Sequence, residues 1–380
     1  MALKKSALYS SLWSSCDALR GGMDASQYKD YVLSLLFIKY ISDRYDGQPF
    51  SPIKIPKGAS FKAMVALKGK SDIGDQINKR IIAPLAAANQ QLSQSDFPDF
   101  NDAVKLGDGK EKVERLTNLV AIFESRALDF SKNRADGDDI LGDAYEYLMR
   151  HFATESGKSK GQFYTPAEVS RIMARILGIR DARTTSNTTV YDPTCGSGSL
   201  LLKVGDEAGT PITLYGQEKD ATTSGLARMN MILHNNPTAT IIQGNTLSNP
   251  KFLDGDVLKT FDYVVANPPF SDKRWTTGLD PLNDPHDRFA FGVPPKKQAI
   301  TPICCTLSVR SKVPAPARAF CRMACCSEAT PKPAFGAIWF ARGTSRGSSV
   351  CPPTCSMGPA SPPASWWWTR RTRRPVVACS

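Results

Sequence analysis

The spacing of apolar residues divides the chain into a helical first part and an alternating second part. Up to residue 150, apolar side chains recur at helical intervals around Tyr28–Tyr40, Val113–Phe130 and Ile140–Phe152. Residues 46–75, which are rich in Gly, Pro and Lys, are predicted to form loops. The pattern predicts an N-terminal all-α domain over residues 1–150, with a packing or partner-binding role rather than chemistry.

From about residue 161 the period changes to short, apolar, β-branched segments with helical segments between them. The predicted strands and helices are Thr188–Tyr191, Ser199–Ala208, Ile212–Tyr215, Ala221–Asn235, Thr240–Ile242 and Phe261–Ala266. Strands that alternate with helices predict an α/β fold with a doubly wound, mainly parallel sheet. Ligands of such sheets bind at the carboxyl ends of the strands, which is where the motifs described next are found.

A glycine turn follows the first predicted strand and opens a helix. In Asp192-Pro-Thr-Cys-Gly-Ser-Gly, Gly196 and Gly198 permit a tight turn and a close approach of the backbone to a ligand. Such a turn can also be purely structural, but Glu218 ends the next strand where a carboxylate suits ribose hydroxyls. Position 201 is Leu rather than the third glycine of a dinucleotide motif, which favours a nucleotide ligand without a pyrophosphate.

The tetrapeptide Asn267-Pro268-Pro269-Phe270 comes directly after the last apolar strand. Two acceptors, the Asn267 side-chain oxygen and the Pro268 carbonyl, could hold the two N–H bonds of an exocyclic amine and localise its lone pair, and the prolines would keep them rigid. Phe270 offers a face on which a base extruded from a duplex can stack. With the amine held in this way, transfer of a methyl group from a sulfonium needs alignment more than acid–base catalysis. The alternative is that the tetrapeptide only ends the strand and that Phe270 lies in the core.

Two further motifs flank these residues. Gly161–Pro166 precedes a helix, and Thr165 followed by proline, with Glu168 three positions after Thr165, predicts a capping box. This turn either packs against a cofactor, with Phe163 or Tyr164 lining the pocket, or is an ordinary helix cap.

The third predicted strand is followed by Gln243-Gly-Asn245, where Asn245 could bind an adenine or simply make a turn. His151, His234 and His286 show no metal-binding spacing, so no metal site is expected. Cys195 is expected to be a small packed residue rather than a nucleophile.

Charge and cysteine are concentrated at one end of the chain. Residues 298–380 hold eight of the ten cysteines and eleven Lys or Arg against one acid, Glu328, so +10 of the net charge of +12 lies there. The remaining +2 on residues 1–297 indicates little electrostatic affinity for nucleic acid. No apolar stretch reaches the length of about 18 residues that a membrane span needs, and the start of the chain lacks the apolar core of a signal peptide.

Three interpretations of residues 298–380 compete. A disulfide or metal module fits poorly because the cysteines lack paired CxxC spacing and no His accompanies them. A basic nucleic-acid tail fits poorly because of Trp366–Trp368 and the near absence of Lys. A shifted reading frame fits better, since Trp366–Thr369 read one base earlier becomes an apolar run that ends in Asp. The segment is therefore interpreted as an aberrant, disordered tail.

Between residues 161 and 297 the chain carries GQFYTP, DPTCGSG, YGQE, GNTL and ANPPF in that order, and this set resembles adenine-specific DNA methyltransferases. The helical start, LWSSCDALRGGMDASQYKDYVLSLLFIKYISD, resembles the methylation subunit of type I restriction-modification systems. The resemblance implies an S-adenosylmethionine-dependent methyltransferase domain over residues 151–297, with the later part of the sheet replaced by the tail. It implies catalytic roles for Asn267, Pro268, Pro269 and Phe270. The implied cofactor-binding residues are Gln162, Phe163, Tyr164, Thr165, Pro166, Asp192, Thr194, Cys195, Gly196, Gly198, Glu218 and Asn245.

The same resemblance implies methyl transfer to the exocyclic amine of adenine in double-stranded DNA, in the cytoplasm, together with specificity and restriction subunits. Two alternatives stay open. The amine could belong to a protein glutamine or an RNA base. The chain could instead be a catalytically defective, truncated subunit that binds only cofactor or partners.

Overall fold

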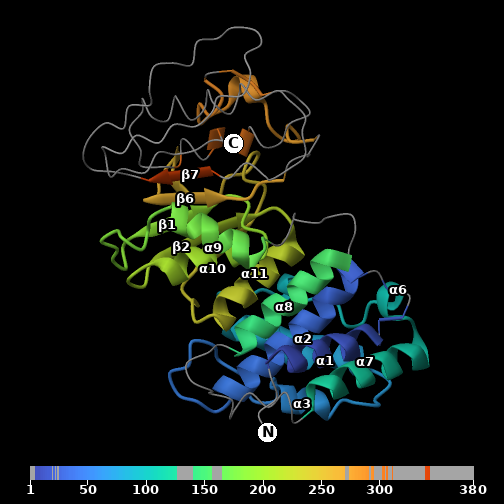
Figure 1. Cartoon of the computed structure of the whole chain (residues 1–380). Helices are drawn as coiled ribbons and strands as arrows, with labels where there is room; N and C mark the ends of the chain where they lie inside the picture. The colour runs from blue at the N-terminus through green and yellow to red at the C-terminus, as the bar shows by residue number, and fades with distance from the viewer. Residues whose placement is uncertain are drawn as a thin grey trace.

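The computed structural model describes residues 5–18, 20–21, 23, 25–125, 140–155, 165–269, 274–290, 292–294, 302–303, 305–306, 310 and 339–342. Figure 1 shows a bundle of helices built from the first part of the chain beside a sheet built from the second part. Helix α11 (Ala221–Leu233) lies between the two. No helix within the described ranges is long and apolar enough to cross a membrane.

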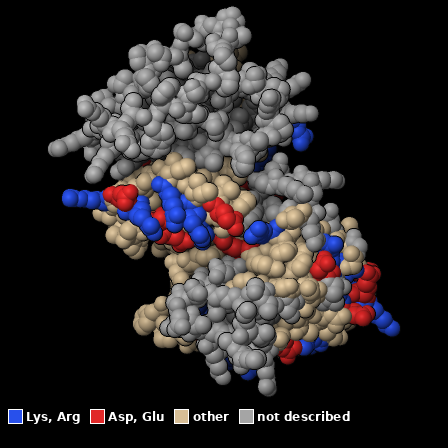
Figure 2. Space-filling view, in the orientation of Figure 1, with Lys and Arg blue, Asp and Glu red and all other residues tan. Residues whose placement is uncertain are grey.

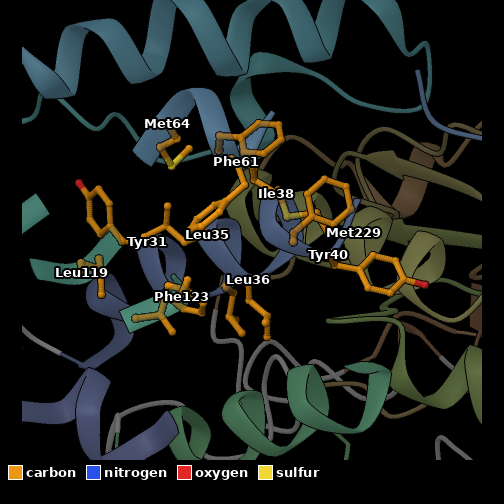
Figure 3. Packing of buried hydrophobic residues seen from close by; sticks show 14 of the residues in the cluster. Tyr31, Leu35, Leu36, Ile38, Tyr40, Phe61, Met64, Leu119, Phe123 and Met229 are labelled. Carbon is orange, nitrogen blue, oxygen red and sulfur yellow. The ribbon is translucent and has the colours of Figure 1, made fainter. Parts of the chain in front are cut away.

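Helix α2 (Ala25–Tyr45) is the centre of the N-terminal bundle. Its residues from Tyr31 to Tyr40 are buried on every side, which is why the apolar stretch is nearly continuous there. Helices α7 (Gly109–Phe123) and α8 (Ile140–Glu155) pack against it, and α1 (Lys5–Ala18) packs against these two. The helices predicted from periodicity are present, but α7 ends at Phe123, and residues 126–130 of the second prediction lie outside the described residues. Figure 3 shows Leu35, Leu36 and Ile38 of this helix among side chains from several other elements.

Shorter helical segments complete the bundle, and part of the loop prediction is wrong. Residues 46–75 contain two short helices, α3 (Phe61–Val65) and α4 (Ile73–Gln76). They escaped detection because a helix of four or five residues shows little periodicity, and because lysines and glycines surround them. Later segments are η1 (Ile77–Ile82), α5 (Ala83–Ala88), η2 (Gln94–Asp96) and α6 (Ala103–Leu106).

The second part is a sheet with the strand order β3-β2-β1-β6-β7. The parallel strands are β1 (Thr189–Asp192), β2 (Thr213–Glu218), β3 (Thr240–Gln243) and β6 (Tyr263–Ala266). Each lies within a few residues of its prediction. The chain leaves β1 toward β2 on one side and returns to pair with β1 through β6 on the other, so the sheet has a topological switch point between β1 and β6.

Successive residues of each strand face opposite sides of the sheet. Val190 and Tyr263 point into a cluster made with α9 (Ala167–Ile176), α10 (Ser199–Glu207) and part of α11. Tyr191 and Val264 point to the other side, where the aromatic rings of Phe252, Phe261, Trp275 and Phe289 gather. A two-stranded ribbon, β4 (Leu253–Asp254) with β5 (Val257–Leu258), and the short turn η4 (Pro281–Asn283) belong to this part of the chain.

The segment interpreted as an aberrant tail contributes to the structure where it is described. Ile303 and Cys305 are buried in the aromatic cluster, and Arg310 is enclosed beside Tyr191. Residues Trp339–Arg342 form β7, which pairs antiparallel with β6. The outer edge of β6 is therefore not open, because β7 occupies it along the whole of β6.

Helix α11 joins the two parts of the molecule. Leu226, Met229 and Leu233 belong to the hydrophobic cluster of the N-terminal bundle, whereas Ala227 and Met231 belong to the cluster against the sheet. In Figure 3 Met229 lies beside Ile38 and Tyr40 of α2. One helix thus supplies apolar side chains to both clusters, with one face turned to each.

A polar contact accompanies this packing. Arg228 of α11 pairs with the buried Asp96, with its Nε at 2.9 Å from Oδ2 and a second bond from Nη2 to Oδ1, and Nη1 donates to the Ile241 carbonyl of β3 at 2.9 Å. A Cβ on Gly225 would come within 2.6 Å of the Asp96 Cα, so this position needs glycine for the close approach. The ion pair and the glycine fix α11 against the N-terminal bundle.

Candidate active site

The predicted site residues meet at the carboxyl ends of four parallel strands. Asp192 ends β1, Glu218 ends β2, Asn245 follows β3 and Asn267 follows β6. Because β1 and β6 are neighbours, the glycine turn and the tetrapeptide share the switch point of the sheet. Four predicted residues lie outside the described residues, namely Gln162, Phe163, Tyr164 and Phe270.

The glycine turn after β1 is held by its own backbone and by two neighbouring elements. Thr194 N donates to the Asp192 carboxylate at 2.9 Å, and Gly198 N donates to the Cys195 carbonyl at 2.8 Å. Gly198 has φ +80°, and a Cβ there would lie 2.6 Å from the Cε atom of Met231 on α11. The turn therefore favours glycine here for its backbone conformation, since the neighbouring Met231 atom is the flexible end of its side chain.

Two carboxyl groups face this turn. Glu218 accepts hydrogen bonds from Gly196 N at 3.0 Å and from Asp220 N at 2.9 Å, so its carboxylate is anchored to the turn rather than pointing away from it. Burial raises the pKa of Glu218 above its usual value, against the effect of these backbone donors. Burial also raises the pKa of Asp192 to about 7, and the charge of Glu218 adds to that shift. Two enclosed acids with raised pKa values favour a cationic or hydroxyl-bearing ligand.

The loop after β3 is tied to the glycine turn. The Thr246 hydroxyl donates to the Pro193 carbonyl at 2.5 Å. The Asn245 side-chain oxygen accepts from Leu247 N at 3.0 Å, so Asn245 makes the turn that was one of its two predicted roles. With its oxygen used in this way, the amide nitrogen is the part of Asn245 that is suited to contact an adenine.

Sequence reasoning missed the buried ion pair that holds this loop. Arg288 and Asp284 are both almost completely buried, and the guanidinium also donates to the carbonyls of Thr246 at 3.2 Å and Leu247 at 2.8 Å. The segment that follows the tetrapeptide is thereby fastened to the loop that carries Asn245. Its signal in the sequence was an acid and an arginine four residues apart in a short polar stretch.

A second missed residue is Asn230 in the middle of α11. It is completely buried, and its amide nitrogen donates to the Ser197 carbonyl of the glycine turn at 3.0 Å. A polar residue among the apolar residues Ala227–Leu233 was the available signal. Gln217, also completely buried, plays a similar part in β2 because its side chain bonds the backbone of Asn249 and Lys251.

Asn267 is fixed by a residue that precedes α9. Its amide nitrogen donates to the Thr165 hydroxyl at 3.2 Å. Pro268 is buried and Pro269 is half-buried, so the chain is enclosed as it leaves β6. The predicted capping box is wrong: Pro166 is the N-cap of α9, and no side chain caps that end. Glu168 is exposed and lies 3.7 Å from Arg150 instead.

Cys195 is a packed residue, as predicted. Its thiol is buried against Gly216, where an added Cβ would lie 2.9 Å from Sγ, and burial raises its pKa well above the usual range. Within the described residues no group of three His, Cys, Asp or Glu side chains could hold a metal ion.

Comparison with known families agrees with this geometry. Residues 136–304 match the model of the N-6 DNA methylase family, and residues 8–123 match the HsdM N-terminal domain. The chain belongs to the N-6 DNA methylases of the type I methylase-subunit kind. The first match covers the four parallel strands and every described site residue, and the second covers most of the helical bundle.

Individual relatives support the same assignment. The chain is 32% identical to the type I restriction enzyme MpnII methylase subunit of Mycoplasma pneumoniae over 68% of its own length and 57% of that protein. It is 30% identical to the MjaVIII methylase subunit of Methanocaldococcus jannaschii over 78% of its own length and 54% of that protein. The chain thus spans little more than half the length of these relatives.

A solved structure gives the same result. The methyltransferase subunit of a type I restriction-modification system from Streptococcus thermophilus superposes with a TM-score of 0.66 at 27% identity, covering 81% of this chain and 72% of that one.

Proposed function

We propose that this chain is the modification subunit of a type I restriction-modification system, transferring a methyl group from S-adenosylmethionine to the exocyclic amino group of adenine in double-stranded DNA. The observation that supports this proposal most directly is the position of Asn267 and Pro268 at the end of β6, next to the glycine turn of β1. There the Asn267 side-chain oxygen and the Pro268 carbonyl can accept both N–H bonds of the amine. This favours a localised lone pair on the attacking nitrogen.

The residues present fit the cofactor. Gly198 has a left-handed backbone that favours glycine, and Asp192 and Glu218 provide negative charge and acceptors at the same turn. S-Adenosylmethionine, when bound, supplies an electrophilic methyl group on a sulfonium. Glu218 would orient the ribose hydroxyls, Asn245 would donate to the adenine ring, and Asp192 would face the positively charged end. These contacts place the methyl group, while Asn267 and Pro268 hold the nitrogen that attacks it.

Partner subunits are part of the proposal, because the described surface offers little electrostatic affinity for DNA. On the face seen in Figure 2, basic and acidic side chains alternate over the part of the sheet domain that carries α9 and α10. Several are paired, such as Arg175 and Arg180 with Glu207 and Lys203 with Asp206. We infer that a specificity subunit selects the DNA site in the cytoplasm and that a restriction subunit joins the complex for cleavage.

We further infer that residues from about 298 onward are translated in a shifted frame. Of the 83 residues 298–380, 65 are amino acids whose codons carry C or G at the second position, and only Gln298, Lys312, Glu328 and Lys332 need A there. Read one base earlier, these second positions become third positions, where a gene can be rich in C and G without changing its protein. Sequencing the gene and its transcript tests this: an alternative frame interrupted by stop codons would remove the inference.

The function is tested by methyl transfer with the chain purified together with a type I specificity subunit from the same organism. Unmethylated genomic DNA, RNA and a glutamine-bearing protein serve as acceptors, and N6-methyladenine is measured by mass spectrometry. Asn267→Ala is expected to lower transfer to DNA by about 100- to 1000-fold, with cofactor affinity within twofold. Asn236→Ala, on the loop after α11, is the matched control. Undiminished transfer by Asn267→Ala, or transfer to RNA or protein only, would contradict the proposal.

A further inference from the structure

The hydroxyl of Thr165 serves Asn267 rather than the helix it precedes. Helix α9 begins at Ala167 without any side-chain cap, although Thr165 stands where a capping hydroxyl was predicted. Instead, Thr165 Oγ1 accepts a hydrogen bond from Asn267 Nδ2 at 3.2 Å, from a residue 102 positions away in the chain. The Thr165 hydroxyl therefore binds the tetrapeptide instead of capping α9.

The direction of the Asn267 amide decides what it offers to an amine. A carboxamide has an oxygen that accepts and a nitrogen that donates, and the two are almost equal in size. An amine that is to be held by both of its N–H bonds needs the oxygen. Because the nitrogen of Asn267 is bound to Thr165, the oxygen is directed away from Thr165 and is the atom left for a substrate.

Thr165 itself is held by the start of α9. Ser170 N donates to the Pro166 carbonyl at 2.9 Å, and the completely buried Ser170 hydroxyl points back to the Thr165 carbonyl at 3.5 Å. Helix α9 packs along α10, the helix that the glycine turn opens. The partner of Asn267 is therefore fixed to a rigid element, which is the condition for orienting a side chain.

We propose that Thr165 is a positioning residue of this site: its hydroxyl holds the Asn267 amide nitrogen so that the side-chain oxygen faces the target amine. The proposal rests on the proposed function for the identity of the amine, while the contact itself does not. It gives the Gly161–Pro166 motif a role toward the substrate in addition to the cofactor contact that the resemblance implies.

Kinetics with two variants of Thr165 test the role. Thr165→Val keeps the branched shape and removes the hydroxyl, whereas Thr165→Ser keeps the hydroxyl. Thr165→Val is expected to lower kcat for methyl transfer to DNA by about 10- to 100-fold at saturating S-adenosylmethionine, because a misdirected amide withdraws one acceptor, whereas loss of a cofactor contact alone would raise only KM. Thr165→Ser is expected to stay within about threefold of the wild type in both. A raised KM for the cofactor at unchanged kcat would overturn the proposal.

A second readout does not depend on activity. Selective 15N labelling of asparagine gives side-chain amide resonances, and the one that disappears in Asn267→Ala belongs to Asn267. In Thr165→Val this resonance is expected to shift and its protons to exchange faster, with both effects reversed in Thr165→Ser. An unmoved resonance overturns the proposal even if the variant is slow. If the wild type transfers no methyl group to DNA but the resonance responds, the proposed function fails and the positioning contact stands.

Discussion

Among the residues that the structure describes, Arg288 and Arg310 are buried and Arg228 is partly buried, and the three differ in how their donors are used. Arg228 and Arg288, both in residues 1–297, each face a buried carboxylate, and Nε, Nη1 and Nη2 of each donate to an acceptor. Arg310, from the tail, lies over the ring of Tyr191 and donates only through Nη1, to the carbonyls of Phe252 and Lys259. Its Nε and Nη2 have no acceptor among the described residues.

This difference in hydrogen-bond partners separates the arginines of residues 1–297 from the arginine of the tail. A buried guanidinium without a carboxylate loses its hydration and regains little, and burial accordingly lowers the pKa of Arg310. The surroundings of Arg228 and Arg288 contain the partners that such a charge needs. The pocket beside Tyr191 is built of aromatic rings and does not, which agrees with a tail that is foreign to this sheet.

The same substitution at the three positions should have opposite effects. Arg228→Met and Arg288→Met each leave a buried carboxylate unpaired and are expected to lower the free energy of unfolding by about 3–5 kcal/mol. Arg310→Met loses the bonds of Nη1 to two carbonyls but also removes a buried charge whose Nε and Nη2 have no acceptor, and it is expected to raise the free energy of unfolding by about 1–2 kcal/mol. Urea unfolding followed by circular dichroism measures all three at one pH.

Methionine suits this comparison because it is long, flexible and uncharged at every position. The double variant Asp96→Leu/Arg228→Met serves as the control, since it removes both charges and should recover most of the loss. A fall in stability for Arg310→Met as large as for Arg288→Met would show that Arg310 belongs to this core.

Asp192 is a buried charge of a third kind, whose partner is expected to be the ligand. Its pKa of about 7 means that the carboxyl is protonated below and ionised above that pH. A cationic ligand prefers the ionised form, so affinity for S-adenosylmethionine should rise by about tenfold from pH 6 to pH 8 and stay flat in Asp192→Asn. Calorimetry measures both, and an equal rise in both proteins would assign the titration elsewhere.

In the free protein the raised pKa of Asp192 makes the stability fall as the pH rises, whereas it makes the affinity for the ligand rise. The unfolded carboxyl ionises near 3.8, whereas the folded one holds its proton to about 7. The stability contributed by neutral Asp192 is therefore complete below about pH 4 and is lost as the pH rises toward 7.

The smallest effect concerns the absent capping box. Glu168 is exposed and pairs only loosely with Arg150, so Glu168→Gln is expected to change the free energy of unfolding by less than about 0.5 kcal/mol. Thermal unfolding at low and high salt is the measurement. A loss above about 1 kcal/mol at both salt concentrations would mean that Glu168 caps α9 after all.

Much of the sheet could be predicted because its signals are local. The strands from β1 to β6 are short apolar runs, and each candidate motif directly follows one of them, so parallel topology alone brings Asp192, Glu218 and Asn267 to one edge. The family resemblance added the cofactor and the amine. Neither the pattern nor the resemblance indicated that β7 pairs with β6.

The features of the fold and site that could not be predicted depend on contacts between residues far apart in the sequence. Thr165 carries a strong capping signal, but tertiary structure gives its hydroxyl to Asn267, and no local rule contains that choice. Gly225 looks like a weak point in a helix until Asp96 is placed against it. Arg288 and Asn230 were missed, because each donates to backbone carbonyls of a distant loop or turn that a sequence does not display.

The sharing of α11 between two hydrophobic clusters has a consequence for how such chains can be rearranged. Recombination that exchanged the N-terminal bundle for a different one would leave Leu226, Met229 and Leu233 without their neighbours, although they are encoded within the sheet domain. A hybrid joined at the boundary between the two matched domains is therefore expected to be less stable than one that inherits the N-terminal bundle and α11 together.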